Sequence, residues 1–466
     1  MPPQPRREPK DNPRYEKLVR VLLMLVVLVA LETYTMRHAF ANGRFPLAQQ
    51  ALVVPGGKGN GLVVRSTFGL LVSRDRGRSF DWVCEQTFGY SGAWDPPIAY
   101  DADGTLYLGL ENGLVSTRDF CNVTRIAELE GETVKDLSVD SAGTVLVVTT
   151  TPTRPSALFR RLKGKPFERV GKGLEGAYLV TVDAAPSRPS RVYVTGQPLG
   201  TLLGRFYRSD DGGATFKELE QARSHDGAYF LVGVDPKDPA RVVSRFLHFE
   251  GSEIALSEDA AKTSKTVLSM KSAMYGAAMA PDGAHVFAAS GLSTDGVFVS
   301  SDRGRTFQSR AHVGAQCLTA TEHALFQCEN PFSLGGPAFG VSEDFGKTFH
   351  TVSSFDAVRG PIACPGSDVC KKAFADLTTT LAPWRGGLDG GADDAGRVDG
   401  GSADDGGSVD GGPVGGSDGG NAPEARKRGC GCQHAEPDGI HGGAFALGVW
   451  AFARARRRRS FSRHGR

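Results

Sequence analysis

A serine followed two residues later by an aspartate recurs in the stretches VSRDRGRSF (72–80), RSDDGGATF (208–216), VSSDRGRTF (299–307) and VSEDFGKTF (341–349). Carboxylates and hydroxyls held at a fixed spacing can carry out acid–base or nucleophilic chemistry. The same side chains can instead lock a turn, because Asp, Ser and Thr hydrogen-bond nearby backbone groups and glycine supplies a positive φ. The repeat is therefore either a site for chemistry or a corner of the architecture.

Aligned, the four stretches share the pattern Ser-x-Asp-x-Gly-x-Ser/Thr-Phe. The residues that carry it are Ser73, Asp75, Gly77, Ser79 and Phe80; Ser209, Asp211, Gly213, Thr215 and Phe216; Ser300, Asp302, Gly304, Thr306 and Phe307; and Ser342, Asp344, Gly346, Thr348 and Phe349. The pattern resembles the Asp-box, or bacterial neuraminidase repeat, of sialidases, sortilin-type receptors and photosystem assembly factors. In those families the box lies at the blade rim, away from the funnel that binds ligands. The resemblance implies that the aspartates staple turns and are not catalytic acids.

The spacing of the repeat predicts the architecture. Degenerate copies lie at 115–123 and 256–264, and a strand pair without a box fills 157–170. The corners then fall near residues 73, 116, 160, 209, 257, 300 and 342, at the interval of about 40 to 50 residues that is typical of a four-stranded propeller blade. We predict an all-β fold, a seven-bladed β-propeller of four-stranded antiparallel blades over residues 42–385, in which neighbouring blades bury each other's apolar faces.

Composition agrees with this prediction. The chain of 466 residues contains 60 glycines and 26 prolines, which favours many short strands bounded by turns. The formal net charge is only +2, and charges of both signs are mixed through the middle of the chain. We therefore expect no nucleic-acid partner. No motif indicates a cofactor.

The N-terminal residues 1–41 read as an export signal. A basic leader precedes the apolar run VLLMLVVLVAL (21–31), and AFA (39–41) offers small residues for cleavage between Ala41 and Asn42. An uncleaved membrane anchor is the alternative, but the run ends at Glu32 and is shorter than the roughly 20 residues that a span requires. We expect an exported protein, secreted or held at the cell surface or outer membrane.

Cysteine usage supports export. Six of the eight cysteines lie between residues 84 and 370, an even number that favours three disulfides in an oxidising compartment. The expected pairs are Cys317 with Cys328 across a hairpin, Cys364 with Cys370 around a tight loop, and Cys84 with Cys121. No CxxC pair or zinc-type histidine spacing is present, so we expect no metal site.

The C-terminal part changes character. Residues 386–428 are mostly Gly, Asp and Ser, which predicts a disordered linker. In residues 429–466, Cys430 and Cys432 precede a short apolar stretch and an arginine cluster. This arrangement resembles the MYXO-CTERM sorting tag of myxobacterial surface proteins. The resemblance implies partners in the export and tag-processing machinery and a transient stay in the inner membrane; a disordered basic tail is the alternative.

A propeller scaffold does not fix an activity. The first hypothesis is a binding module without catalysis, whose ligand is a glycan or a protein. The second is a sialidase-like glycoside hydrolase; the resemblance implies three arginines for the substrate carboxylate, a tyrosine nucleophile paired with a glutamate, and an aspartate acid/base. A third is a grip on membrane partners through an arginine-bearing surface, as in photosystem assembly factors.

Few residues fit the catalytic hypothesis. Arg44 in GRFP (43–46) loosely matches the first sialidase arginine, and the other arginines to test are Arg205, Arg241 and Arg245. The strand tyrosines Tyr107, Tyr193 and Tyr229 are expected to be packing rings. Trp94, Asp95 and Asp101 form a predicted rim cluster that suits sugar stacking or an ordinary loop between blades. We therefore assign no catalytic residue and favour the binding module.

Overall fold

The computed structural model describes residues 46–56, 60–91, 94–151, 154–219, 226–329, 339–366 and 368–385. All of them belong to the first of two units of the chain, residues 1–395. The predicted signal peptide with its cleavage site, Arg44, the linker, and the tag with Cys430 and Cys432 lie outside the described residues and stay predictions.

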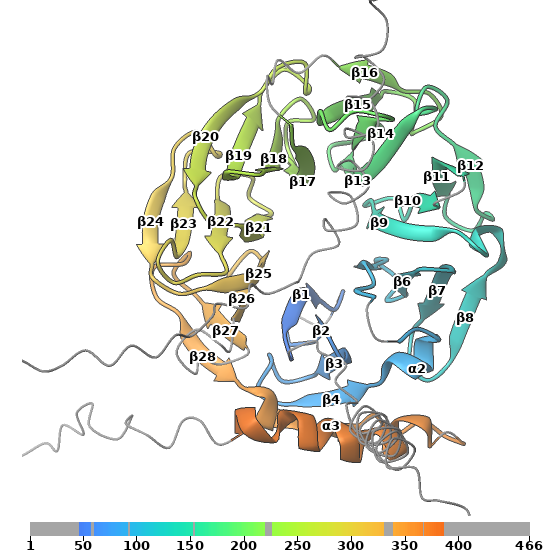
Figure 1. The fold of residues 1–466 in the computed structure, drawn as a ribbon, viewed down its shortest axis with the longest axis vertical. Helices are drawn as coiled ribbons and strands as arrows, with labels where there is room; N and C mark the ends of the chain where they lie inside the picture. Colours follow the sequence, from blue (N-terminus) through green and yellow to red (C-terminus); the bar gives the residue numbers. More distant parts are fainter. Residues whose placement is uncertain are drawn as a thin grey trace, which may run out of the picture. The chain divides into compact units, whose positions relative to one another are not determined.

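The described strands form seven sheets arranged around a central axis, with β1, β9, β13, β17, β21 and β25 innermost (Figure 1). Blades 1 to 3 consist of β1 (Ala48–Val53), β2 (Leu62–Ser66), β3 (Gly69–Ser73) and β4 (Phe80–Val83); β5 (Ile98–Tyr100), β6 (Leu106–Leu110), β7 (Gly113–Thr117) and β8 (Val123–Ile126); and β9 (Thr133–Val139), β10 (Val145–Thr151), β11 (Arg154–Arg161) and β12 (Glu168–Val170). The short helix α2 (Glu85–Phe88) follows blade 1, and the 3₁₀ turn η1 (Ala127–Leu129) follows blade 2.

Blades 4 to 7 repeat the same order of strands. They consist of β13 (Ala177–Ala185), β14 (Arg188–Pro198), β15 (Arg205–Ser209) and β16 (Lys217–Leu219); β17 (Ala228–Val234), β18 (Val242–His248), β19 (Gly251–Ser257) and β20 (Lys265–Met270); β21 (Met274–Met279), β22 (Val286–Ser290), β23 (Val297–Ser300) and β24 (Gln308–Ala311); and β25 (Ala315–Ala320), β26 (Leu325–Glu329), β27 (Phe339–Ser342) and β28 (His350–Ser353). The prediction of seven four-stranded antiparallel blades is confirmed.

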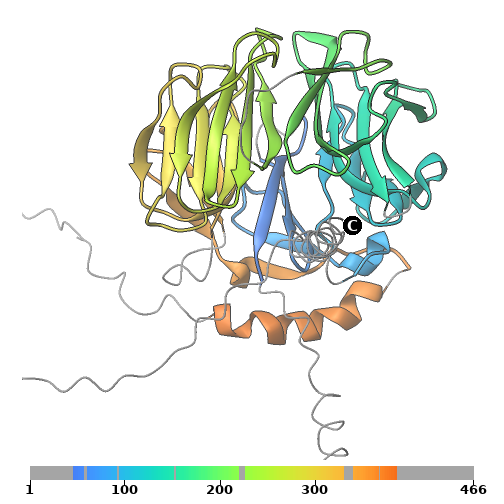
Figure 2. The same ribbon diagram turned by 45° about the horizontal axis from the view of Figure 1, so that its top comes forward.

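Antiparallel order within each blade creates two different faces. The loops joining the first strand to the second and the third to the fourth lie at one end, which we call the box face because the Ser-x-Asp turns lie there. The loops joining the second strand to the third, and each blade to the next, lie at the other end, which we call the opposite face. The wedge-like stacking of the blades is visible in the turned view (Figure 2).

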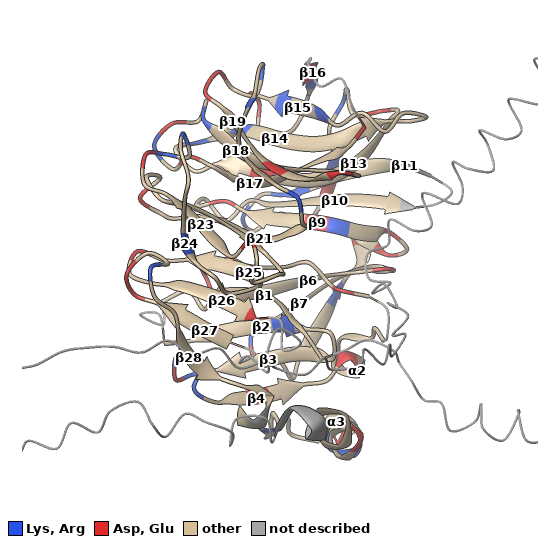
Figure 3. Cartoon of the chain, turned by 60° about the vertical axis from the view of Figure 1, so that its left-hand side comes forward, with Lys and Arg blue, Asp and Glu red and all other residues tan. Residues whose placement is uncertain are grey.

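The core is divided among the seams between blades. Within the described residues, seven clusters of buried apolar side chains each join two neighbouring blades. Charged residues gather in the turns at the strand ends, while the strands are mostly uncharged (Figure 3). Each blade therefore contributes one apolar face to each of two seams, which explains why one unit alone could not fold.

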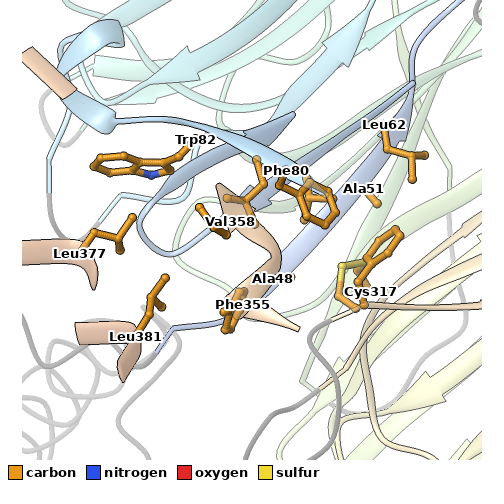
Figure 4. Close-up of a cluster of buried hydrophobic side chains, with 14 of the residues drawn as sticks. Ala48, Ala51, Leu62, Phe80, Trp82, Cys317, Phe355, Val358, Leu377 and Leu381 are labelled. Carbon is orange, nitrogen blue, oxygen red and sulfur yellow. A yellow bond between two sulfur atoms is a disulfide. The ribbon is translucent and has the colours of Figure 1, made fainter. Parts of the chain in front are cut away.

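A C-terminal segment closes the ring at blade 1. After the 3₁₀ turn η2 (Phe355–Ala357), β29 (Val358–Pro361) pairs in parallel with β4. Helix α3 (Val369–Arg385) follows and buries Leu377 and Leu381 in the cluster that contains Trp82 (Figure 4). Only a disulfide-bonded loop was predicted from the sequence in this segment, and the helix was not anticipated.

The disulfides differ in part from the prediction. Cys317 and Cys328 are bonded across the β25–β26 hairpin as expected. The other two predicted pairs are wrong, because the bonds are Cys84–Cys370 and Cys121–Cys364. Both tie the closing segment to blades 1 and 2, since ring closure brings together residues 286 and 243 positions apart in the sequence.

Candidate functional site

The four predicted boxes are turns locked by their own side chains. In the turn of blade 4, the hydroxyl of Ser209 donates to Oδ1 of Asp211 at 2.7 Å and accepts from the backbone N–H of Gly213 at 2.9 Å. The carboxylate of Asp211 also accepts from the backbone N–H and the hydroxyl of Thr215, at 2.9 and 2.6 Å. The turns after Ser73, Ser300 and Ser342 repeat this set of bonds.

The bonding in these turns leaves little capacity for acid–base work. Hydrogen bonds from Thr215 and Ser209 lower the pKa of Asp211 to about 2, so the side chain stays ionised at neutral pH. A Cβ at Gly77, whose φ is +87°, would lie 2.7 Å from the ring of Phe339 in blade 7. Glycine is therefore required there both by the turn and by the contact with the neighbouring blade.

The degenerate copies behave as their sequences suggest. In blade 5 the same bonds join Ser257, Asp259 and Thr263, with Ala261 in the glycine position at a φ of +61°. In blade 2 the carboxylate of Asp119 accepts from the N–H groups of Cys121 and Asn122 instead.

The three arginines proposed for testing do not converge. Arg205 pairs with Glu218 at 3.3 Å on the outer strands of blade 4. Arg241 is 1% exposed and lies 3.4 Å from Asp235 in a hairpin at the box face. Arg245 lies farther along β18, toward the opposite face. The described residues therefore contain no three-arginine cluster built from these side chains.

The tyrosines are packing rings, as predicted. Tyr107, Tyr193 and Tyr229 are all at most 1% exposed. Tyr229 lies between the rings of Phe206 and Phe246, with centroid distances of 4.8 and 4.7 Å. None of the three is accessible to a substrate.

The predicted cluster of Trp94, Asp95 and Asp101 is separated by a strand. Asp101 follows the end of β5, is 3% exposed and pairs with Arg161 at 3.3 Å. Trp94 and Asp95 precede β5 and lie at the opposite face. The three-membered cluster is therefore wrong, because an extended strand carries its two ends to different faces.

A ring of bulges on the innermost strands was not foreseen. In six of the described innermost strands the pairing with the second strand skips one residue. The skipped residues are Gln49, Lys135, Val180, Val232, Tyr275 and Gln316, which we call the bulge ring. All six keep exposed surface. Bulges redirect side chains and are frequent beside binding sites, so this ring is the candidate ligand site.

Trp94 and Asp95 complete the ring where β5 has no bulge. The ammonium of Lys135 lies 5.4 Å from the centroid of the Trp94 ring, and the indole N–H donates to the carbonyl of Gly109 at 2.8 Å. The amide of Gln49 donates to Asp95 at 3.0 Å. Burial lowers the pKa of Lys135. This sector presents an aromatic face, a cation and hydrogen-bonding groups, a set that suits sugars and peptides alike.

Arg245 lies in the sector of the ring formed by blades 5 and 6. Its Nη1 donates to the backbone carbonyls of Met274 at 2.6 Å and Tyr275 at 3.0 Å, and its guanidinium lies 4.9 Å from the ring centroid of Phe230. Within the described part of the chain, no carboxylate forms an ion pair with it. Burial lowers its pKa to about 10, because desolvation of the charge is not offset by a neighbouring anion.

Two carboxylates lie on the innermost strands near the ring. Burial raises the pKa of Asp136 and of Asp183 to about 7, and the charge of Asp183 adds to the rise at Asp136. Asp136 accepts from the N–H of Val182 in blade 4 at 2.9 Å, and Asp183 accepts from the N–H of Val234 in blade 5. Both therefore bridge blades. An acidic residue at an apolar position of a predicted strand was the sequence signal that could have revealed them.

Other candidate sites are less developed. A pocket of about 240 Å³ beside the two closing disulfides contains Lys371 as its only titratable lining residue. No group of three or more metal-ligating side chains occurs among the residues that the structure describes. In the same residues, no helix has the length and apolar character to cross a bilayer.

Comparisons with known proteins show only distant structural likeness. No protein-family model matches the sequence, and no curated protein matches it. An ancestral GH74 enzyme has a similar structure, with a TM-score of 0.48 and 13% identity over 66% of this chain and 44% of its own. YCF48 from Cyanidioschyzon merolae has a TM-score of 0.42 and 12% identity, over 60% of this chain and 92% of its own. Hydrazine synthase from Kuenenia stuttgartiensis has a TM-score of 0.47 and 12% identity, over 63% of this chain and 94% of its own. The chain thus spans less than half the length of the GH74 structure.

Proposed function

We propose that this chain is an exported, surface-displayed β-propeller that binds a glycan or protein ligand at the bulge ring without catalysis. The observation that carries the proposal is the ring itself, where partly exposed bulge side chains lie on the innermost strands of six blades around one axis. The box turns are structural corners in this proposal, because their carboxylates are engaged by their own turns.

The Trp94 sector gives the sharpest test of the site. The full chain is screened on a glycan array and against protein ligands, and the affinity of each binder is measured for Trp94→Ala and Lys135→Ala variants. A loss of tenfold or more is expected. The matched control is His323→Ala, an exposed hairpin residue at the box face. Unchanged affinity in both ring variants would overturn the assignment of the site.

Export and display have their own support. Three disulfides fit an oxidising compartment, and the apolar run at 21–31 and the tag at 429–466 fit export and sorting. Deletion of residues 422–466 is expected to abolish surface labelling of intact cells. If labelling is unchanged, the tag does not act in display.

A glycoside hydrolase is the second candidate, favoured by one observation. Carboxyl groups with a pKa near neutrality are the usual acids and bases of such enzymes, and Asp136 and Asp183 have this property beside the bulge ring. Fluorogenic sialosides and other glycosides are incubated with the wild-type chain and with Asp136→Asn and Asp183→Asn. Turnover that either substitution abolishes would establish the enzyme; the binding proposal predicts no turnover.

A further inference from the structure

Large apolar side chains are exposed together on the opposite face of blades 4 to 6. Leu199 is 60% exposed between β14 and β15, Phe249 is fully exposed between β18 and β19, and Leu292 is 53% exposed between β22 and β23. These three loops are equivalent, since each joins the second strand of its blade to the third. Exposed apolar side chains in the same loop of three consecutive blades are a feature expected of a protein contact site.

The equivalent loops elsewhere differ. In blade 1 the loop contains Phe68, whose ring packs edge-on against Phe355 at 5.3 Å. In blade 2 it contains Glu111 and Asn112, both polar and exposed. Among the loops of this kind that the structure describes, exposed apolar tips therefore belong to blades 4 to 6.

Tyr275 and Arg245 connect this surface to the bulge ring. Tyr275 is 39% exposed, and a Cβ on Gly291, the residue before Leu292, would lie 2.8 Å from its ring. The carbonyl of Tyr275 accepts from Arg245. The guanidinium of Arg245 thus contacts the backbone of Tyr275, whose ring lies close to Gly291 at the start of the Leu292 loop, and it forms no ion pair with a described carboxylate.

We propose that this surface docks an extended segment of a partner protein, placing a carboxylate on Arg245 and apolar side chains against Phe249, Leu199 and Leu292. The inference rests on the proposed binding function and names its ligand class. Phe249 follows Arg245 by four positions and lies one residue beyond the end of β18, so the two are at most about 13 Å apart along the chain, which an extended peptide of about four residues spans. A carboxylate there would compensate a cation that is already desolvated, and Nη2 is available for it.

The residues around the three tips disfavour a membrane or a glycan as the occupant. Glu250 is exposed next to Phe249, and Asp295 lies near Leu292, where it accepts a hydrogen bond from Ser272. Such acidic residues would be repelled by an anionic bilayer. Two of the three tips, Leu199 and Leu292, offer no flat aromatic face for a sugar ring, whereas all three pack well against apolar side chains of a peptide.

The test is a selection with a phage-displayed library of random linear 12-residue peptides on the full chain. The enriched peptides are expected to share an Asp or Glu close to Leu, Phe or Trp. Fluorescence anisotropy with the synthetic peptide then measures affinity for Phe249→Ser and Arg245→Gln, and we expect a loss of at least tenfold in each. Arg245→Lys is expected to recover part of the affinity, because it keeps the charge.

The matched controls are Leu162→Ser and Phe345→Ser, exposed apolar residues outside this surface, which are expected to leave the affinity unchanged. Failure to enrich a peptide, or equal affinity for Phe249→Ser and the wild type, would overturn the inference. If the wild-type chain binds anionic vesicles and Phe249→Ser abolishes that binding, the occupant is a membrane and the peptide inference is wrong. Ligand binding lost only in Trp94→Ala would overturn it while leaving the proposed function intact.

Discussion

Oδ2 of Asp136 in blade 3 accepts a hydrogen bond from the backbone N–H of Val182 in blade 4, at 2.9 Å. Similar bonds join the innermost strands of other neighbouring blades. Thr181 accepts from the N–H of Leu231 at 3.1 Å, and the hydroxyl of Thr319 donates to the carbonyl of Ala51 at 2.6 Å. Side chains of innermost strands thus fasten each of these blades to the next, including blade 7 to blade 1.

Asp136 and Asp183 make the stability of the ring dependent on pH. Because their folded-state pKa of about 7 is above the unfolded value, the folded chain binds more protons between about pH 4 and pH 7. The free energy of unfolding therefore falls as pH rises through this window. In Asp136→Asn the side-chain oxygen can still accept the hydrogen bond from the backbone N–H of Val182. This substitution is expected to raise the free energy of unfolding at pH 8 by up to about 4 kcal/mol.

Thermal unfolding at pH 5 and pH 8 checks this. Little difference between Asp136→Asn and wild type is expected at pH 5, where the wild-type carboxyl is protonated in the folded state. Equal destabilisation by the substitution at both pH values would mean that Asp136 is ionised in the folded protein.

Breaking the hydrogen bonds of a box turn is expected to lower the free energy of unfolding. Asp211→Ala removes the acceptor for Ser209 and Thr215, and the expected cost is about 1 to 2 kcal/mol of unfolding free energy, because the turn is partly solvated. Denaturant unfolding measures it, with exposed Lys217→Ala as the control. Ligand binding at the bulge ring should be unaffected; impaired binding by a correctly folded Asp211→Ala variant would give the box a functional role.

The disulfides should differ in their contributions. With Cys121–Cys364 intact, the Cys84–Cys370 bond closes an effective loop of about 45 residues and contributes about 4 kcal/mol in the loop-entropy description, against about 3 kcal/mol for Cys317–Cys328. Double Ser variants of each pair are compared by denaturant unfolding. A larger loss for the hairpin pair would show that the closing segment is not needed to hold the ring.

Much of the fold could be read from the sequence, since each corner must carry a turn motif. The predicted corners near 209, 257, 300 and 342 coincide with the ends of β15, β19, β23 and β27. The disulfides at Cys84 and Cys121 could not be predicted in the same way, because their partners come close only when the ring closes. Short sequence separation favoured the wrong pairs.

The candidate site was harder to predict for a related reason. A bulge such as that at Lys135 exists only relative to a partner strand, and the sequence of one strand does not reveal its register. Trp94 was identified as part of a predicted rim cluster because its ring suits sugar stacking. The burial of Asp101 was not predicted, because it depends on the ion pair with Arg161 in the next blade.

The central claim is that ligand binding belongs to the bulge ring and not to the box face. The most direct measurement compares the affinity of a ligand from the array or the peptide selection for two triple variants. The account predicts a loss of at least tenfold for Trp94→Ala/Lys135→Ala/Tyr275→Ala and none for Leu162→Ser/His323→Ala/Phe345→Ser. Loss of binding in the second variant alone, with both variants folded, would contradict it.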